Sequence, residues 1–244
     1  MTKDGLVYVL SADPGGKKDT FFALLTRADK VNKTIGVISG ISWKFVDGQI
    51  DYTTIEKDLS LIYAKYAIDF FVVEENNTGL HVVQTMKSQY HVPTYAVYTA
   101  NNIKTQKTIR KGTTMDKSEH LGWINQQIYA KKLLKSKNPS PGVQRLMAQM
   151  ASFVKEEVGG KIKYHAEGNQ PDDAVMALMI NTFFIRRKIF GEGGITGKRQ
   201  VAFKKYNERD IALAVKSAIP DDCKMLGSTT KMSTATPTGK YRIH

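Results

Sequence analysis

Apolar and polar runs along the first part of the chain predict a meander of strands. The stretch "LVYVLSAD" ends at Asp13 and is followed by "PGGKKD", a loop sequence that combines Pro, Gly and charged residues. Two further apolar runs, "TFFALLTR" and "KTIGVIS", are joined by the polar connector "ADKVN". Because short connectors favour antiparallel neighbours, we expect three antiparallel strands here.

The next segments alternate between helical and strand patterns. Over residues 53–66 the apolar positions recur at helical spacing, and Thr53 or Thr54 stands where a helix cap is expected. The run "FFVVE", at residues 70–74, has no polar alternation and is typical of a strand buried on both faces. A helix and a strand complete a parallel crossover, over residues 79–90 and 93–98.

The remainder of the chain is predicted to be mostly helical, up to a change in composition at Gly191. We expect helices over residues 116–134, 143–154 and 172–190, with "GGKIKYHAEG" forming a small turn and strand before the last helix. Beyond Gly191 the sequence is first glycine-rich and then rich in Ser and Thr. This predicts a folded domain over residues 1–190 and a basic appendage over 191–244 with a flexible tail.

The order of these elements indicates the fold class. Three antiparallel strands are followed by a helix, a strand, a helix, a strand and further helices. This is the order of the ribonuclease H-like fold, an α/β fold with a mixed sheet. We therefore expect a five-stranded central sheet with helices on both faces.

The charge of the chain points to a polyanionic partner. The formal net charge is +13 and the sequence pI is about 9.6, a balance that favours nucleic acid. A single cysteine, Cys223, rules out a disulfide within the chain and fits a reducing compartment. No apolar run approaches a membrane span, and the first residues lack a signal-peptide pattern, so we expect a cytoplasmic protein with no membrane partner.

Acidic residues stand at the ends of elements that this fold would bring together. Asp13 ends the first strand, Glu74 and Glu75 end the fourth, and Asp172 and Asp173 open the last helix. Singly, each has an ordinary explanation as a turn residue, a solvated strand end or a helix cap. Together they would repel one another unless a hard divalent cation, which prefers oxygen ligands, lay between them. The grouping, with the basic charge, favours a metal-dependent nuclease.

Three blocks of the sequence resemble the nuclease domain of the large terminase subunit of tailed bacteriophages. The blocks are "ADPGGKKDTFFAL", "VVEENNTG" and "DDAVMALMI", and they span residues 13–180. The middle block is the most specific, because an acid followed one residue later by Asn and then by a small-residue turn is unusual. The resemblance implies metal-dependent cleavage of double-stranded DNA during genome packaging, with two divalent ions, Mg²⁺ or Mn²⁺.

Carried over to this sequence, the resemblance also implies roles for individual residues. The first metal-binding Asp falls on Asp13, and the acid of the fourth strand falls on Glu74, with Glu75 as the fallback. The third acid falls on Asp173, with Asp172 assisting or exchanging roles with it. Asp19 matches a further acid of the first block, which implies a supporting position behind the ligands.

The expected partners are double-stranded DNA and, by resemblance, the portal and the small terminase subunit, in the cytoplasm of a phage-infected host. A phosphate-contacting group is predicted at three- and four-residue spacing: Lys104, Lys107, Arg110 and Lys111. The chain departs from a full large terminase in lacking a packaging ATPase motif. The nearest sequence, "GEGGITGKR", has Glu192 where the phosphate loop needs Gly and Arg199 where it needs Ser or Thr.

Two other readings of the sequence stay open. One is another ribonuclease H-like nuclease, such as a junction resolvase or an enzyme that hydrolyses RNA/DNA hybrids. The other is a catalytically silent DNA-binding domain of a packaging or replication complex.

Overall fold

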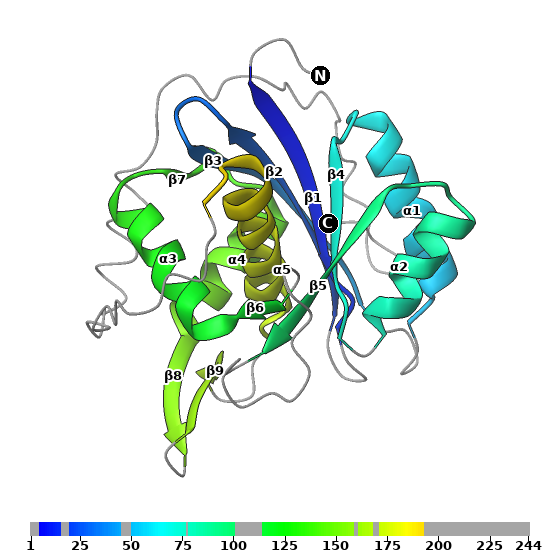
Figure 1. Ribbon diagram of the computed structural model, residues 1–244. Helices are drawn as coiled ribbons and strands as arrows, with labels where there is room; N and C mark the ends of the chain where they lie inside the picture. Colours follow the sequence, from blue (N-terminus) through cyan, green and yellow to red (C-terminus); the bar gives the residue numbers. More distant parts are fainter. Residues whose placement is uncertain are drawn as a thin grey trace.

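A mixed sheet with helices on both faces forms the body of the molecule (Figure 1). The computed structural model describes residues 5–15, 20–44, 50–76, 78–100, 114–158, 161–167 and 171–192. The sheet has seven strands in the order β6-β5-β4-β1-β2-β3-β7, so the expected number of five was too low. The five predicted strands are its centre, and β6 and β7 are added at the two edges.

The predicted antiparallel meander is confirmed. Its strands are β1 (Leu6–Asp13), β2 (Phe21–Asp29) and β3 (Thr34–Trp43). β2 pairs antiparallel with both neighbours, and a register irregularity interrupts its pairing with β3 between Leu25 and Thr26. As a result, β1 and β3 run in the same direction on either side of β2.

The first helix, α1 (Tyr52–Lys65), forms where the spacing predicts it, but its cap differs from the expectation. Asp51, and not Thr53 or Thr54, is the N-cap residue, and its carboxylate accepts a 3.1 Å hydrogen bond from the Thr54 amide. The negative charge of a carboxylate at this position also interacts favourably with the positive end of the helix dipole. A neutral threonine hydroxyl interacts with it more weakly.

The predicted strand–helix–strand unit is present as β4 (Phe70–Glu74), α2 (Gly79–Ser88) and β5 (Thr94–Ala100). β4 lies between β1 and β5 and is parallel to both. Alternate side chains of β4 enter two different cores, with Phe71 and Val73 on one face and Val72 on the other. This explains why the apolar run is unbroken.

The helix expected over residues 116–134 is shorter, and strands flank it. The segment forms β6 (Thr114–Asp116), α3 (Lys117–Tyr129) and β7 (Leu133–Lys135). Asp116 caps α3 by accepting a hydrogen bond from the Glu119 amide, and Lys131 takes a left-handed conformation, with φ 53°, just after the helix. The chain can then turn so that β7 pairs with the first residues of β3.

The last part of the described chain contains two helices and a hairpin. It comprises α4 (Pro141–Ser152), β8 (Phe153–Val158), β9 (Lys161–Ala166), α5 (Asp173–Phe184) and a π-helical turn, η3 (Ile185–Ile189). The helix expected to reach residue 154 therefore ends at Ser152, where the hairpin begins. This hairpin projects from the body of the molecule (Figure 1).

Helices of different character cover the two faces of the sheet. α1 and α2 pack on one face, where Leu59, Phe71 and Met86 are buried together. The other face is covered by α3, α4 and α5, and every residue of α5 is buried. A helix that is buried all round must lie in the middle of the core, and α5 does so against β1, β2 and β4.

Two features fix the helices on this second face. The Ser11 hydroxyl donates a 2.9 Å hydrogen bond to the Ala177 carbonyl, which ties α5 to β1. α4 approaches β3 so closely that a Cβ on Gly142 would lie 2.0 Å from the Gly40 carbonyl oxygen. Only glycine permits this approach, and it sets the position of the side chains one turn further along α4.

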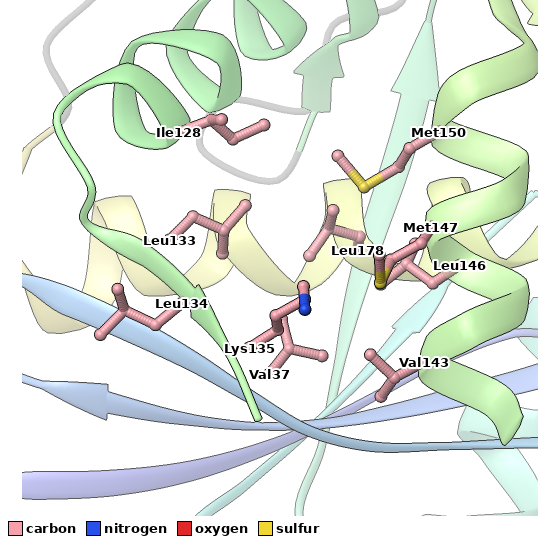
Figure 2. Close-up of a pocket in the computed structure, with 10 residues that line it drawn as sticks. All are labelled: Val37, Ile128, Leu133, Leu134, Lys135, Val143, Leu146, Met147, Met150 and Leu178. Atoms are coloured by element: carbon pink, nitrogen blue, oxygen red, sulfur yellow. The ribbon is translucent and has the colours of Figure 1, made fainter. Parts of the chain in front are cut away.

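An apolar pocket of about 40 Å³ lies between α3, β7, α4 and α5 (Figure 2). Its lining includes Ile128, Leu133, Met147, Met150 and Leu178. The lining lacks the converging polar groups that fix a ligand, which is typical of a packing gap filled by flexible Met side chains. Among the residues that the structure describes, no helix is long and apolar enough to cross a membrane.

Candidate active site

Asp13 and Glu74 meet at the carboxyl ends of two adjacent parallel strands. The pairing of β1 with β4 reaches Ala12 and Val73, so the next residue of each strand stands at the same edge of the sheet (Figure 1). Asp13 is buried, with 6% of its surface exposed, and Glu74 is half-buried. Their carboxyl groups lie within hydrogen-bonding reach of each other.

The surroundings of Asp13 favour its protonated form. Burial raises the pKa of its carboxyl well above the ordinary value of 3.8, and the negative charge of Glu74 raises it further. Asp173 acts in the same direction, so the third predicted acid is near enough to repel Asp13. A 3.0 Å hydrogen bond from the Gly15 amide opposes these effects but does not outweigh them.

Glu74 is held in one orientation by its neighbours. Its Oε1 accepts hydrogen bonds from the Asn76 side-chain amide, at 3.2 Å, and from the Thr99 hydroxyl. The Asn76 amide also donates to the Thr99 hydroxyl at 2.8 Å, which closes a small network across β4 and β5. The turn after β4 therefore orients the side chain of Glu74 through Asn76, in addition to leading the chain into α2.

The turn sequence "NNTG" also allows α2 to start close to the end of β4. A Cβ on Gly79 would lie 1.6 Å from the Glu74 carbonyl oxygen, so no larger residue fits there. The Glu75 amide donates to the Val97 carbonyl at 2.8 Å and thus continues the β4–β5 ladder by one residue. Glu74 is the acid whose charge acts most strongly on Asp13. This geometry favours Glu74 over the fallback Glu75 as the partner of Asp13.

Asp173, the first residue of α5, is bound by two side chains from α4. Arg145 Nη2 donates to Asp173 Oδ1 at 2.9 Å and to Oδ2 at 3.0 Å, and Gln149 Nε2 donates to Oδ1 at 3.0 Å. Burial raises the pKa of Asp173, while Arg145 and Gln149 partly offset that effect. Asp172 is the N-cap residue of α5, and its side chain makes no capping hydrogen bond.

Several residues of this neighbourhood were not identified from the sequence. Gln149 supports the start of α5, because its Oε1 accepts from the Ala174 amide at 2.8 Å. Arg145 also donates to the Thr20 hydroxyl at 2.6 Å. The one available indication was the polar pair Arg145 and Gln149, four residues apart on a helix whose neighbouring positions Val143 and Leu146 are apolar.

Other predicted residues lie outside the part of the chain that the structure describes. Asp19 falls in the gap between residues 15 and 20. The predicted phosphate-contacting residues fall between 100 and 114: Lys104, Lys107, Arg110 and Lys111. The predicted C-terminal appendage, from residue 193 onward, also lies outside the described residues. Their roles stay predictions.

The donor set can be compared with what a metal ion requires. Asp13 and Glu74 offer only carboxylate oxygens, which suit a hard cation such as Mg²⁺ or Mn²⁺, and their mutual repulsion is the kind that a cation relieves. Among the described residues, however, no group of three or more His, Cys, Asp or Glu lies so that it could hold a metal ion. Asp173 is instead bound to Arg145. The pair of acids fits a cation, and the third acid does not complete the set in this geometry.

Strand order and site together define a ribonuclease H-like α/β domain with two neighbouring carboxyl groups at the ends of its central parallel strands. The chain is similar to solved nuclease domains of large terminases. The P22 large terminase nuclease domain is 10% identical, with a TM-score of 0.49, over 79% of this chain and 88% of that one. The nuclease domain from bacteriophage SPP1, solved with bound Mn, is 9% identical, with a TM-score of 0.44, over 74% of this chain and 86% of that one.

A third solved structure is also similar. RuvC of T. thermophilus, solved with a Holliday junction, is 14% identical, with a TM-score of 0.36, over 74% of this chain and 95% of that one. No protein-family model and no curated protein matches the chain. At these identities the likeness is one of overall shape, and the chemistry of this chain has to come from its own side chains.

Proposed function

We propose that this chain is a metal-dependent endonuclease that cleaves double-stranded DNA with little sequence preference. One observation carries the proposal: Asp13 and Glu74 stand side by side at adjacent strand ends, where burial and mutual repulsion make two charged carboxylates costly without a cation. A protein that needed only a stable core would gain nothing from this pairing. A nuclease needs it in order to hold a metal ion next to a phosphodiester.

Each acidic residue has a proposed role. Asp13 and Glu74 are metal ligands, and Asp173, assisted by Asp172, is the third acid of a set for two divalent ions, which it can complete only when it is released from Arg145. Bound ions of this kind activate water and stabilise the leaving oxygen of a phosphodiester. Neighbouring side chains orient these acids: Thr99 and Asn76 orient Glu74, and Gln149 orients Asp173.

The setting proposed for this activity is viral genome packaging in the cytoplasm of a host cell. The net charge of +13 suits a DNA substrate. The terminase-like sequence blocks support a partnership with the portal and the small terminase subunit. Because the nearest sequence to a phosphate loop departs from that motif at two positions, we expect cleavage that does not require ATP.

The decisive experiment is nicking of a supercoiled plasmid with Mg²⁺, with Mn²⁺ and with excess chelator, each with and without ATP. We expect cleavage with either metal and none in chelator, and no effect of ATP. Linear duplex, four-way junctions and RNA/DNA hybrids should be compared in the same assay. A strong preference for junctions or hybrids would point to another ribonuclease H-like nuclease, and binding without cleavage would point to a silent DNA-binding domain.

Metal binding can be checked without any activity assay. An ion that binds the folded site and not the unfolded chain stabilises the protein by about 2.7 kcal/mol at a concentration of 100 times its Kd. Thermal unfolding with Mn²⁺ and with chelator should therefore give clearly different melting temperatures. Identical melting temperatures over a wide range of Mn²⁺ concentration would contradict the proposed function.

A further inference from the structure

Arg145 places a permanent positive charge on the third acid of the site. One of its nitrogens contacts both oxygens of Asp173, at 2.9 and 3.0 Å. The Asp173 side chain is almost fully buried, with 1% exposed, whereas the Arg145 side chain keeps 23% of its surface in solvent. Arg145 is therefore the more exposed partner of this ion pair.

This contact is more than is needed to attach α4 to α5. Gln149 already joins the two helices by accepting from the Ala174 amide and donating to Asp173. The close approach of Gly142 to Gly40 independently fixes α4 on the sheet. A buried ion pair contributes little net stability, because desolvation of the charges offsets their attraction. A purely structural role would thus leave the charge of Arg145 unexplained.

The charge has a direct consequence for metal binding. A carboxylate that already accepts three hydrogen bonds, two of them from a cation, is a poor ligand for a second cation. A guanidinium and a divalent ion that share one carboxylate repel each other at short range, where protein screens the charges less than bulk water does. Asp13 and Glu74, by contrast, repel one another when both are ionised. The two sides of the site should therefore differ in their affinity for metal.

We propose that Arg145 is a positioning residue that acts as an internal counter-cation. It compensates Asp173 when the site holds no metal, and it lowers the affinity of the complete three-acid set for divalent ions. This inference rests on the proposed function, because it assumes that the acids bind metal. It adds a residue that regulates the metal affinity of the site without being a ligand.

The test compares Arg145→Gln with a matched control. Arg186→Gln removes an arginine whose ion pair with Glu119, at 3.2 Å, lies beyond the other end of α5. Mn²⁺ binding is measured by calorimetry without DNA, and thermal unfolding is measured in chelator. We expect Arg145→Gln to bind Mn²⁺ about tenfold more tightly and to melt at a lower temperature in chelator than the original protein. Arg145→Lys should restore both values, and Arg186→Gln should not change Mn²⁺ affinity.

The other possible outcomes also test the counter-cation role of Arg145. Unchanged or weaker Mn²⁺ binding by Arg145→Gln, while the original protein binds Mn²⁺, would overturn the counter-cation role and leave the proposed function intact. Failure of the original protein to bind Mn²⁺ would overturn both. If Arg145→Gln does not fold in chelator, Mn²⁺ should restore its folded state, seen by circular dichroism, and failure to do so would overturn the inference.

Discussion

At the two ends of α5, burial shifts the pKa values of titratable groups in opposite directions. At its N-terminal end Asp173 and the nearby Asp13 are acids whose pKa values are raised. At its C-terminal end Thr182 hydrogen-bonds His120, whose pKa burial lowers from 6.5 to about 3, with the charge of Arg186 contributing. In both places burial favours the neutral form, which for an acid means gaining a proton and for a histidine means losing one.

The two ends differ in how the buried group is accommodated. Neutral His120 is held by a 2.9 Å hydrogen bond to the Thr182 hydroxyl and by a stacked contact with Trp123, although its Nδ1 is buried without a hydrogen-bond partner. Asp13 instead lies beside a second carboxyl group, Glu74, that disfavours its charge. The histidine end holds a ring that stays neutral, and the acid end is a cluster that an added cation would stabilise. Burial of a titratable group therefore does not by itself indicate a functional site. A buried acid that lies beside a second acid is the stronger indication.

The largest expected effect is on cleavage. Asp13→Asn and Glu74→Gln should each reduce nicking by more than about 100-fold, because even partners outside the ligand shell typically contribute 10–100-fold. Both variants should fold, and their melting temperatures in chelator should equal or exceed that of the original protein because repulsion is removed. Asp173→Asn should also lose most activity.

Glu75→Gln is the matched control for this test, because it makes the same chemical change one residue away. It should retain nearly full activity. An active Glu74→Gln together with an inactive Glu75→Gln would move the assignment by one residue. Full activity in Glu74→Gln, Glu75→Gln and Asp13→Asn would rule out the site.

The next effect is on stability at low pH and concerns the histidine end. Between pH 6.5 and about 3 the unfolded chain binds a proton at His120 that the folded protein does not, so stability falls as the pH falls through this window. The slope from this one group is at most about 1.4 kcal/mol per pH unit. The contribution of Asp13 has the opposite sign, because its raised pKa makes the folded form gain stability as the pH falls.

Urea unfolding at pH 7.5, 6, 5 and 4 can isolate the histidine contribution. His120→Asn removes the titrating group and should lose less stability than the original protein between pH 6.5 and 4. At pH 7.5 no difference should arise from titration, although poorer packing will lower the stability of the variant uniformly. Parallel curves for the two proteins would show that His120 does not control this pH dependence.

A smaller effect should follow from moving Glu74 without changing its charge. Gly79→Ala would place a Cβ 1.6 Å from the Glu74 carbonyl oxygen, so α2 or the end of β4 must shift. We expect a loss of about 1–3 kcal/mol in unfolding free energy, as for overpacked cores, together with reduced nicking. Gly36→Ala is the control, since its Cβ would meet its nearest neighbour at 3.8 Å. Equal behaviour of the two variants would contradict the proposed role of the turn.

The smallest effect concerns DNA binding by the predicted phosphate-contacting residues. Changing Lys104, Lys107 and Arg110 together to Ala should weaken binding to unrelated duplexes about equally. The slope of log affinity against log salt concentration should become shallower by roughly 0.9 for each phosphate that the variant no longer neutralises. Binding to two unrelated duplexes at several salt concentrations measures this. An unchanged slope would show that these residues only solvate the surface, and weaker binding to one sequence alone would indicate base readout.

The elements predicted from the sequence were those with strong local patterns. The meander, the helix predicted over residues 53–66 and observed over 52–65, and the buried strand ending at Glu74 all form, because their periodicity and turn residues reflect the local environment. The edge strands β6 and β7 were missed, since three residues are too few to show a period. Their formation depends on exposed edges of β5 and β3 that only the assembled sheet provides.

The acids that could gather can be identified from the sequence, because Asp13 and Glu74 stand at strand ends and Asp173 opens a buried helix. How these acids are held depends on the folded chain. Glu74 is oriented by Thr99, a residue 25 positions away, and Asp173 is compensated by Arg145, 28 positions away. Interactions at such separations leave no periodic trace in a single sequence, since they depend on which strand becomes the neighbour and how closely one helix approaches another. The residue types that could carry out the chemistry can thus be identified from local sequence, whereas the balance of charge around them depends on the fold.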